Sequence, residues 1–312
     1  VLASICAAAL ALSLAACSST SSSTSSAAEE SSSAASTSST TEESSSADEG
    51  SASTASGAIT VVTREDGSGT RSAFVELTGV ETDEGDMTIA TAQTANSTNN
   101  VMTSVAADPN AIGYISMGSL NDTVKGIAVD GVEPTTDNVK AGTYPISRPF
   151  NLVTNGEVSA QSELVQDFIN WVMSADGQAV VSEDGYIGDD AAEAYTSTQP
   201  EGSIVVGGST SVSTVMEKLI EAYAEVNPNA TVELQTQDST TGVNNALSGT
   251  YDIGMASRAV ADSETEQGAV ATQLAMDGIA VVVNTGNGIS DISMDSLRGI
   301  YTGEITDWAD VQ

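Results

Sequence analysis

The chain has no histidine and only two cysteines among its 312 residues. Without histidine it cannot form a Ser-His-Asp triad, a Cys-His pair or a histidine-ligated zinc site. The cysteines are Cys6 and Cys17, so no residue beyond position 17 can form a disulfide, act as a thiol nucleophile or bind a metal through sulfur. These absences exclude most of the familiar hydrolase chemistry.

Basic residues are also scarce. Eight lysines and arginines stand against 43 acidic residues, which gives a formal net charge of −35. Six of the acids lie before residue 58, so the rest of the chain carries 37 acids against 8 bases, a net charge of −29. So few scattered cations cannot form a basic face, which excludes nucleic acid as a partner.

No long apolar run is present at the start of the chain. Residues 1–16 carry no charge, and their apolar stretch, residues 7–14, is too short to cross a membrane. The segment 14–17, Leu-Ala-Ala-Cys, resembles the lipobox of bacterial lipoproteins. That resemblance implies a signal peptide over residues 1–17 and a lipid on Cys17, and the alternative is an ordinary secretory signal with a chance cysteine.

Residues 18–57 lack every large apolar side chain. They consist of Ser, Thr, Ala, Glu, Asp and Gly, with six acids and no base. Such a segment cannot bury enough apolar surface to offset the entropy of ordering it, so we expect a disordered tether. The tether would let an anchored domain stand away from the membrane.

The most informative segment is residues 64–70, Arg-Glu-Asp-Gly-Ser-Gly-Thr, which follows the apolar run 59–63. The pattern predicts a strand, a glycine turn and the start of a helix. Such a turn directs unpaired backbone N–H groups, hydroxyls and the positive end of a helix dipole at one place. Arg64 adds a planar set of donors that suits a tetrahedral oxyanion. These groups act at about 3 Å, whereas distant carboxylates are screened beyond roughly 8 Å.

The same order of strand, hydroxyl-rich turn and helix occurs twice more. Residues 203–206 predict a strand, followed by the turn 207–211 and a helix with an apolar face from Val212 to Tyr223. Residues 231–234 predict another strand, followed by the turn 238–242 and a short helix. Serine and threonine are common N-caps without any ligand, but three such turns together indicate one shared oxyanion pocket.

These turns fit the known nucleotide-binding motifs less well than they fit an oxyanion pocket. No lysine follows any of them, as a P-loop requires, and Ser72 replaces the third glycine of the dinucleotide fingerprint. No cofactor is implied.

Several longer motifs resemble the phosphate-binding proteins of ABC importers. Those similar to the second half of such proteins are residues 64–71, 111–116 and 144–149. Those similar to the first half are residues 208–212, 238–242, 252–258 and 300–308. The resemblance covers nearly all of residues 58–312. It implies an α/β, two-lobed fold of the periplasmic-binding-protein type (type II), with a hinge and a central cleft.

The two halves stand in the opposite order to that of the usual family member. The resemblance therefore implies a circular permutation, with new termini at Gln312 and near Ile59, in which residues 195–202 join the usual termini. The alternative is a truncated tandem array whose half-domains pair between chains. Permutation predicts a monomer, and pairing between chains predicts an oligomer.

The family architecture then gives the lobes. One lobe would combine residues 58–148 with 279–312 and carry the Arg64 turn. The other would be continuous over residues 149–278 and carry the turns at residues 210 and 239. The hinge would lie near residues 148–153 and 279–284.

Site residues follow from the resemblance, position by position. Thr210 and Ser211 would donate from one turn and Ser239 from the next. Asp66 would hold Arg64 in place. The remaining contacts from the opposite lobe would come from Arg64, Ser68, Gly69 and Thr70.

One position departs from the family pattern. Arg258, counted among the ligand-binding residues, stands where well-known members have an aspartate that accepts the phosphate proton. Phosphate at neutral pH retains a proton and sulfate does not, so an acceptor in the pocket tells them apart. Asp66 is the candidate acceptor that remains.

The sequence thus predicts a lipid-anchored, extracytoplasmic, monomeric protein. It would bind inorganic phosphate and pass it to the membrane permease of an ABC importer, without a metal, a cofactor or covalent chemistry. The alternatives are a receptor for sulfate or molybdate, a carboxylate-dependent hydrolase, and an adhesion or sensory protein on the same fold. The lack of histidine and cysteine and the 4% aromatic content weigh against the hydrolase, although 43 acids leave two-carboxylate catalysis open.

Overall fold

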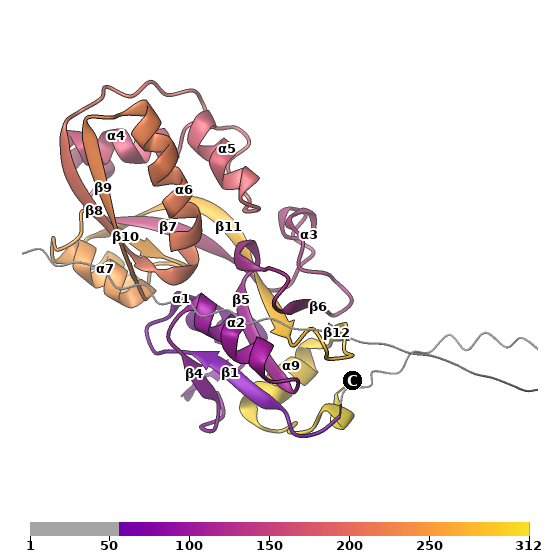
Figure 1. Cartoon of the computed structure of the whole chain (residues 1–312). Helices are drawn as coiled ribbons and strands as arrows, with labels where there is room; N and C mark the ends of the chain where they lie inside the picture. The colour runs from indigo at the N-terminus through magenta and orange to yellow at the C-terminus, as the bar shows by residue number, and fades with distance from the viewer. Residues whose placement is uncertain (1–55, 312) are drawn as a thin grey trace, which may run out of the picture. The chain divides into compact units, whose positions relative to one another are not determined.

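A computed structural model describes residues 56–311 of the chain (Figure 1). The predicted signal peptide, Cys17 and all but the last two residues of the predicted tether lie outside the described residues. Over the described range, no helix combines the length and the apolar character needed to cross a bilayer.

The described chain is an α/β structure with two main apolar cores. We call the elements that pack around the first core the first lobe. Its strands are β1 (Thr60–Arg64), β2 (Glu81–Thr82), β3 (Gly85–Asp86), β4 (Gln93–Ala95), β5 (Ala111–Ser116), β6 (Lys125–Val129) and β12 (Asp291–Ile292). Its helices are α1 (Gly69–Thr78), α2 (Thr98–Ala107), α3 (Thr136–Lys140) and α9 (Met294–Thr302), with short 3-10 turns η1 (Met117–Ser119) and η3 (Trp308–Asp310).

The second lobe is built around the second core and a small apolar cluster beside it. Its strands are β8 (Gly202–Ser209), β9 (Ala230–Gln237) and β10 (Ile253–Ala256). Its helices are α4 (Glu163–Val172), α5 (Ala175–Glu183), α6 (Thr210–Val226), α7 (Ser239–Leu247) and α8 (Asp262–Thr265), with the 3-10 turn η2 (Val158–Ala160).

Two long strands, β7 (Ser147–Asn155) and β11 (Ala269–Val283), connect the lobes. They pair antiparallel from Gly278 opposite Ser147 to Ala269 opposite Asn155. β11 also pairs with β5 and β6 of the first lobe, and β7 also pairs with β10 of the second. Within the described residues one sheet therefore runs through both lobes, in the order β4-β1-β5-β11-β7-β10-β8-β9.

The passage between the cores is short on both strands. The chain leaves the first core at Ile146 and enters the second at Phe150, and on β11 it leaves the second core at Ala275 and returns to the first at Ile279. The crossing on β11 thus ends where the predicted hinge segment, residues 279–284, begins.

Local sequence accounts for the helices that matter most for function. Serine or aspartate caps each of them: Ser68 accepts a hydrogen bond from Arg71 N, Ser97 from Asn100 N, and Asp238 from Thr241 N. The predicted apolar face of α6 is confirmed, because Val212, Val215, Met216, Leu219 and Tyr223 are all buried. Trp171 and Trp308 are also buried in the two cores.

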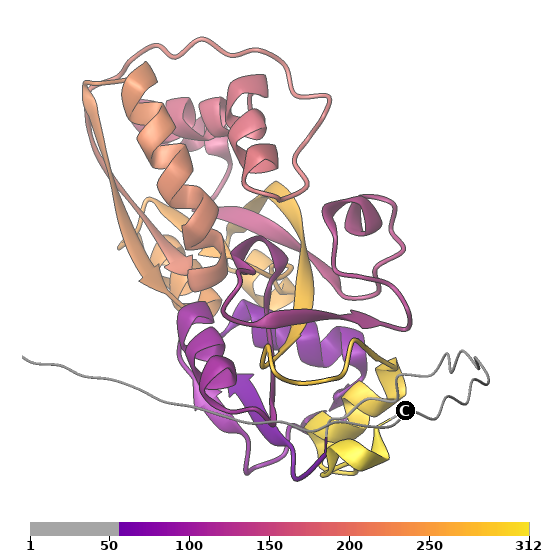
Figure 2. The same cartoon turned by 45° about the vertical axis from the view of Figure 1, so that its right-hand side comes forward.

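The beginning and the end of the described chain lie side by side. Ile59 N donates to Thr306 O at 2.9 Å, and Trp308 N donates to Gly57 O at 3.0 Å. Both views show the C-terminal end beside the start of β1 (Figures 1 and 2). The segment that ends near Trp308 therefore meets the strand that leads into the Arg64 turn.

Residues 195–202, which form the last part of the connection from α5 and the first residue of β8, are fastened to the second lobe by Asp167 of α4. This buried carboxylate accepts hydrogen bonds from Tyr195 Oη (3.0 Å), Ser197 Oγ (2.6 Å), Thr198 N (2.8 Å) and Tyr223 Oη (2.6 Å). Burial raises the pKa of Asp167, but these hydrogen bonds outweigh it and hold the pKa below its usual value. The connector is thus bound to the core rather than loose.

Candidate anion-binding site

Within residues 56–311, four helices begin at one place between the lobes: α1 and α2 of the first lobe, α6 and α7 of the second. Their first residues are Gly69, Thr98, Thr210 and Ser239. The first-turn N–H groups of a helix have no carbonyl partner within it, and the helix dipole places partial positive charge there. The meeting point is therefore electropositive without needing many charged side chains.

Hydroxyl groups from both lobes fill this meeting point, and most of them are hydrogen bonded to a neighbouring hydroxyl. Thr70 Oγ1 and Ser211 Oγ lie 2.9 Å apart, and Thr98 Oγ1 lies 3.4 Å from Ser211 Oγ and 3.3 Å from Thr210 Oγ1. These bonds join the first lobe to the second. We call the set of buried or half-buried hydroxyl residues the hydroxyl cluster; its members are Ser68, Thr70, Thr98, Ser209, Thr210, Ser211, Ser239 and Ser257.

The part of the hydroxyl cluster in the second lobe is organised around Ser257, which directly follows β10. Ser209 Oγ donates to Ser257 Oγ at 2.8 Å, Ser239 Oγ lies 3.3 Å from the same atom, and Ser257 N donates to Ser239 Oγ at 3.1 Å. A hydroxyl can donate one hydrogen bond and accept two, so these groups can be redirected toward an acceptor placed among them.

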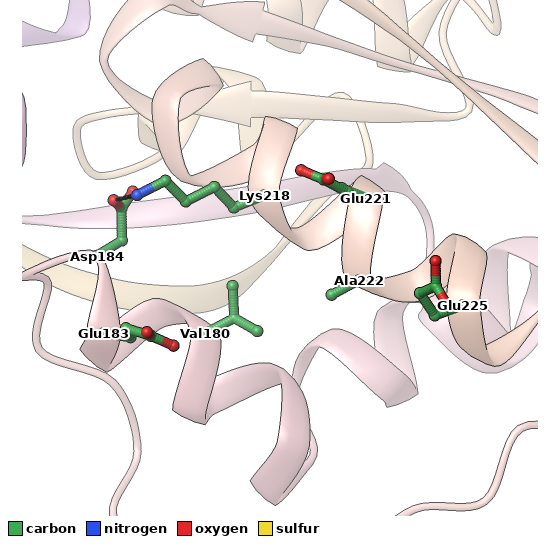
Figure 3. Close-up of a pocket in the computed structure, with 7 residues that line it drawn as sticks. All are labelled: Val180, Glu183, Asp184, Lys218, Glu221, Ala222 and Glu225. Atoms are coloured by element: carbon green, nitrogen blue, oxygen red, sulfur yellow. Dashed lines mark hydrogen bonds and ion pairs between the residues drawn. The ribbon is translucent and has the colours of Figure 1, made fainter.

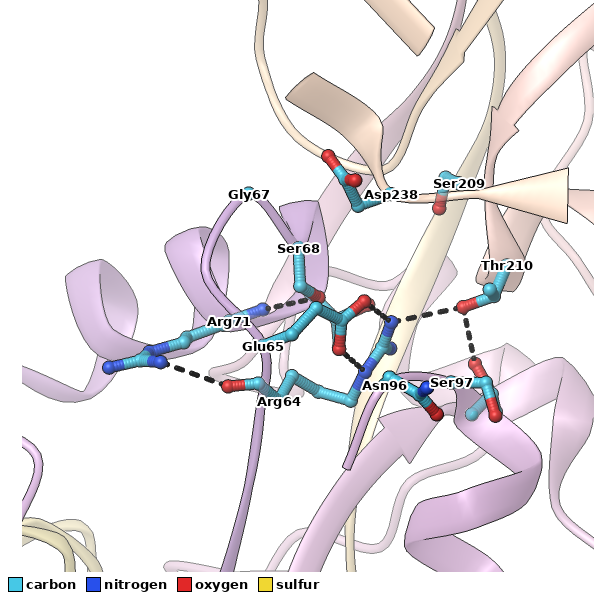
Figure 4. A network of polar contacts seen from close by, with 12 residues as sticks. Arg64, Glu65, Gly67, Ser68, Arg71, Asn96, Ser97, Ser209, Thr210 and Asp238 are labelled. Atoms are coloured by element: carbon cyan, nitrogen blue, oxygen red, sulfur yellow. Dashed lines mark hydrogen bonds and ion pairs between the residues drawn. The ribbon is translucent and has the colours of Figure 1, made fainter. Parts of the chain in front are cut away.

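Arg64, the last residue of β1, is the charged group at this place. Its side chain is 2% exposed. Nε and Nη2 donate to the two carboxylate oxygens of Glu65 at 2.8 and 2.7 Å, and Nη2 also donates to Thr210 Oγ1 at 3.1 Å (Figure 4). One edge of the guanidinium is thus held by Glu65 while its end is directed at the start of α6.

The prediction that Asp66 holds Arg64 is wrong. The Asp66 side chain is fully exposed and accepts a hydrogen bond from Arg71 Nη1 at 2.9 Å. The reason is that β1 ends at Arg64 and the chain then turns, with Gly67 at φ +85°. Side chains two residues apart share a face only while the strand continues, so Glu65 takes the place beside Arg64 and Asp66 turns outward.

Arg258 lies next to the hydroxyl cluster, but its guanidinium is bonded to a carboxylate outside that cluster. Its Nη1 and Nη2 donate to both carboxylate oxygens of Glu264 at 2.8 and 2.7 Å, and Nη2 reaches Thr240 Oγ1 at 3.3 Å. Burial raises the pKa of Glu264, but bonding to Arg258 and to the backbone outweighs it and holds the pKa below its usual value. The charge of Arg258 is therefore largely balanced by Glu264.

The structure brings together most of the predicted site residues: Arg64, Ser68, Gly69, Thr70, Thr210, Ser211 and Ser239. Sequence reasoning missed Glu65, Thr98, Ser209 and Ser257. Thr98 had a detectable signal, because residues 93–100 repeat the order of strand, hydroxyl pair and helix, although without a glycine.

The lobes touch at this site through glycines of the Arg64 turn. Thr240 donates to Gly67 O from both its N and its Oγ1, each at 3.1 Å. A Cβ on Gly69 would lie 2.3 Å from Ser239 Oγ, so only glycine permits this approach. The site lies between two lobes that are closed on one another.

Another hollow in the second lobe has the opposite chemistry. A groove of about 350 Å³ between α5 and α6 is lined by Glu183, Asp184, Glu221 and Glu225, and its one lysine, Lys218, pairs with Asp184 (Figure 3). Carboxylates repel an anion, so this groove is not the oxyanion site. In the described range, no group of three or more acidic side chains is arranged to hold a metal ion.

Comparisons with known proteins agree with this chemistry. A family model described as "PBP superfamily domain" matches residues 22–176 and 193–312. "Phosphate-binding protein PstS 2" of Streptococcus agalactiae is 47% identical over 266 residues, which cover 84% of this chain and 90% of that protein. The crystal structure of a phosphate-binding protein of a phosphate ABC transporter from Streptococcus pneumoniae is 42% identical, covers 82% of this chain and 100% of its own, and has a TM-score of 0.67.

A shorter match is found to "Phosphate-binding protein PstS" of Bacillus subtilis. It is 38% identical over 133 residues, which cover 41% of this chain and 41% of that protein. The longer likenesses confirm the two-lobed fold of periplasmic binding proteins that the sequence predicts.

Proposed function

The chain belongs to the PBP superfamily, and from this premise we propose that it binds inorganic phosphate outside the cytoplasm and delivers it to an ABC importer. The observation that carries the proposal is the convergence of four helix N-termini and buried hydroxyls on the end of Arg64, between the lobes. Helix N-termini and an arginine fork are the groups that bind phosphate in proteins.

In this proposal the bound phosphate takes over hydrogen bonds that the lobes now make to each other. Its oxygens would accept from the first-turn N–H groups of Gly69, Thr70 and Ser211, from the hydroxyls of Thr210 and Ser239, and from the end of Arg64. Ser68 caps α1 and holds that helix end in position. Because donors come from both lobes, ligand binding favours the closed form and excludes water.

Glu65 is our candidate for the group that recognises the phosphate proton. It is a carboxylate beside the end of Arg64, its side chain is 20% exposed, and it takes the role first assigned to Asp66. A carboxylate in bidentate contact with an arginine keeps lone pairs that can accept from a P–OH group. Sulfate at neutral pH has no such proton and would meet an unfavourable carboxylate contact.

We propose that the protein carries out no covalent chemistry. The sequence has no histidine, and the polar groups of the site are neutral hydroxyls, Arg64 and the carboxylate of Glu65, whose two oxygens already accept from that arginine. Such groups hold an anion, and a carboxylate bonded to an arginine through both oxygens is a weak general base. A chromogenic phosphoester incubated with purified protein should therefore remain intact.

We infer the cellular location of the protein in two steps. Substrate-binding proteins of ABC importers act outside the cytoplasm, where they meet the permease. We further propose that lipid on Cys17 anchors this protein to the outer face of the membrane, with residues 18–57 as its tether. Metabolic labelling with a fatty acid should mark the wild-type protein and not Cys17→Ser.

We also propose that the chain is a circularly permuted monomer with lobes of residues 58–148 plus 279–312 and 149–278. Three observations support this. Residues 57–59 are hydrogen bonded to residues 306–308, as expected if these two segments are continuous in the usual chain order. The positions that correspond to the usual termini are joined by residues 195–202, which are hydrogen bonded to Asp167. The match to the Bacillus subtilis protein stops at about half of each chain, as a changed order of halves predicts. Small-angle scattering should give a compact monomer, and a swapped array would give a dimer or longer species.

Calorimetric titration tests the function. The protein should be unfolded and refolded to remove bound ligand, then titrated with phosphate and with sulfate. One-to-one phosphate binding at about micromolar affinity or tighter, with sulfate silent, supports the proposal. Equal binding of sulfate would make it a receptor for another oxyanion, and silence from both anions would refute phosphate binding and leave the resemblance as one of fold alone.

A further inference from the structure

A buried ion pair lies where the two crossing strands pass between the lobes. Arg148 of β7 and Asp277 of β11 are directly opposite each other in the antiparallel ladder. Their side chains are 1% and 0% exposed, and Arg148 Nη2 donates to Asp277 Oδ2 at 3.1 Å. We call these two residues the hinge pair. Each lies midway in its crossing, Arg148 between Ile146 and Phe150 and Asp277 between Ala275 and Ile279.

Each residue of the hinge pair is hydrogen bonded to a different lobe. Asp277 Oδ1 accepts from Ser116 Oγ at 3.0 Å, and Ser116 ends β5 of the first lobe. Arg148 Nη1 donates to Ser257 O at 2.8 Å, and Ser257 follows β10 of the second lobe. A continuous chain of hydrogen bonds therefore runs from Ser116 through the hinge pair to Ser257.

Ser257 carries this chain into the hydroxyl cluster. Its N–H group donates to Ser239 Oγ, and its hydroxyl accepts from Ser209 Oγ. Arg148 thus fixes the carbonyl of the residue whose other polar groups orient the starts of α6 and α7. A shift of Ser257 would turn the hydroxyls of Ser209 and Ser239 away from their present directions.

Stability does not explain why these charges are buried. Taking two ions out of water costs several kcal/mol each, and a well-packed apolar pair of similar volume is often as stable or more stable. Consistent with this, burial raises the pKa of Asp277 to about 6, even though Arg148 and Ser116 act to lower it. Burial therefore works against the charged form of Asp277, and the bonds of the pair to Ser116 and Ser257 point to a role between the lobes.

We propose that the hinge pair is a positioning device that couples the lobe crossing to the anion site, by holding Ser257 and, through it, both the donor Ser239 and Ser209, which caps α6. Arg148 and Asp277 do not touch the ligand. The inference rests on the proposed function for its ligand, phosphate. It also gives residues 144–149, a motif outside the anion turns, a functional role through Arg148.

The decisive variant replaces both charges at once. Arg148→Met with Asp277→Leu keeps the net charge and the approximate volume, so no unpaired ion is left in the core. We expect unfolding by denaturant to be unchanged or shifted to higher denaturant, while phosphate affinity falls about tenfold or more, as when outer-shell partners of ligand groups are removed. If the pair only stabilised the fold, stability and phosphate affinity would fall together in this variant.

Two further variants sharpen the test. Arg148→Lys keeps the charge but its single ammonium cannot hold both Asp277 and Ser257 in the same geometry, so affinity should fall while the fold is retained. Asp167→Asn removes a different buried carboxylate that is tied to the connector, and should lower stability without changing phosphate affinity. Wild-type affinity in the double variant, measured on a wild type that binds phosphate, would overturn the inference.

A second readout separates this inference from the proposed function. Hydrogen exchange of the amides at residues 253–258 and 239–241, measured without added anion, should be faster in the double variant than in the wild type. If the wild type binds no phosphate, the proposed function fails. The positioning role then fails as well if exchange in the double variant is unchanged, and it is supported if exchange rises at these amides only.

Discussion

Replacement of Gly69 by alanine should block closure of the lobes while leaving the fold intact. The added Cβ would lie 2.3 Å from Ser239 Oγ and 2.8 Å from Ser257 Oγ, whereas ordinary contacts begin near 3.4 Å. Ser239 cannot swing aside freely, because its Oγ accepts the Ser257 N–H bond at 3.1 Å. The start of α1 must therefore retreat from the start of α7 by about 1.1 Å.

The magnitude follows from this displacement. A misplacement of about 1 Å costs on the order of 100-fold where several groups must meet one ligand. A 100-fold loss of phosphate affinity corresponds to about 2.7 kcal/mol. Stability should not fall, because Gly69 is the first residue of α1 and alanine is the better helix former.

Calorimetric titration with phosphate and thermal unfolding of the same samples would measure both quantities. The double variant Gly69→Ala, Ser239→Ala removes the closest contact and should recover part of the affinity, although one donor is lost. Ser72→Ala, on the same helix, should bind phosphate like the wild type. Wild-type affinity in Gly69→Ala would refute the closed arrangement of the lobes as the ligand-binding form.

Three other predictions follow from the site and the connector. Arg64→Ala should reduce phosphate affinity by several hundredfold or more in a titration, because it removes a charge-assisted contact in a buried site; affinity within threefold of the wild type would contradict this. Glu65→Gln should narrow the preference for phosphate over sulfate, and an unchanged ratio of the two affinities would exclude Glu65 as the proton acceptor. Asp167 has a lowered pKa in the folded state, so the stability it adds is present above pH 4 and is lost as the pH falls through the folded value. Asp167→Asn should therefore be less stable than the wild type at pH 7, and this difference in stability should narrow as the pH falls below about 4; a difference independent of pH would refute this origin.

The fold could be predicted because the sequence patterns that specify its helices and turns are local, and because its longer motifs are shared with relatives. The helix α6 was predicted from apolar residues at helical spacing, and each of those residues is buried. The turns at residues 67, 208 and 238 were predicted because a cap acts within a few residues of the helix that it begins. The boundaries of the lobes and the order of the halves stay predictions.

The parts of the site that sequence reasoning missed depend on contacts made across the fold. Whether Glu65 or Asp66 faces Arg64 depends on where β1 stops, and the sequence has polar residues at both positions. Arg258 bonds to Glu264 because the chain turns back between the two residues. No periodic pattern in the sequence predicts that turn. Ser257 gains its place only when β7, β10 and α7 come together.

The chemistry of the site has a consequence for the speed of capture. Arg64 is balanced by Glu65 and Arg258 by Glu264, so short-range donors rather than net positive charge hold the ligand, while the surrounding domain carries 37 acids against 8 bases. A divalent anion approaching such a domain is repelled until it is within a few ångströms. Added salt should therefore raise the association rate constant, the reverse of the electrostatic steering seen in oppositely charged pairs, and should leave the dissociation rate nearly unchanged. A receptor of this design would capture phosphate faster in saline surroundings than in dilute ones.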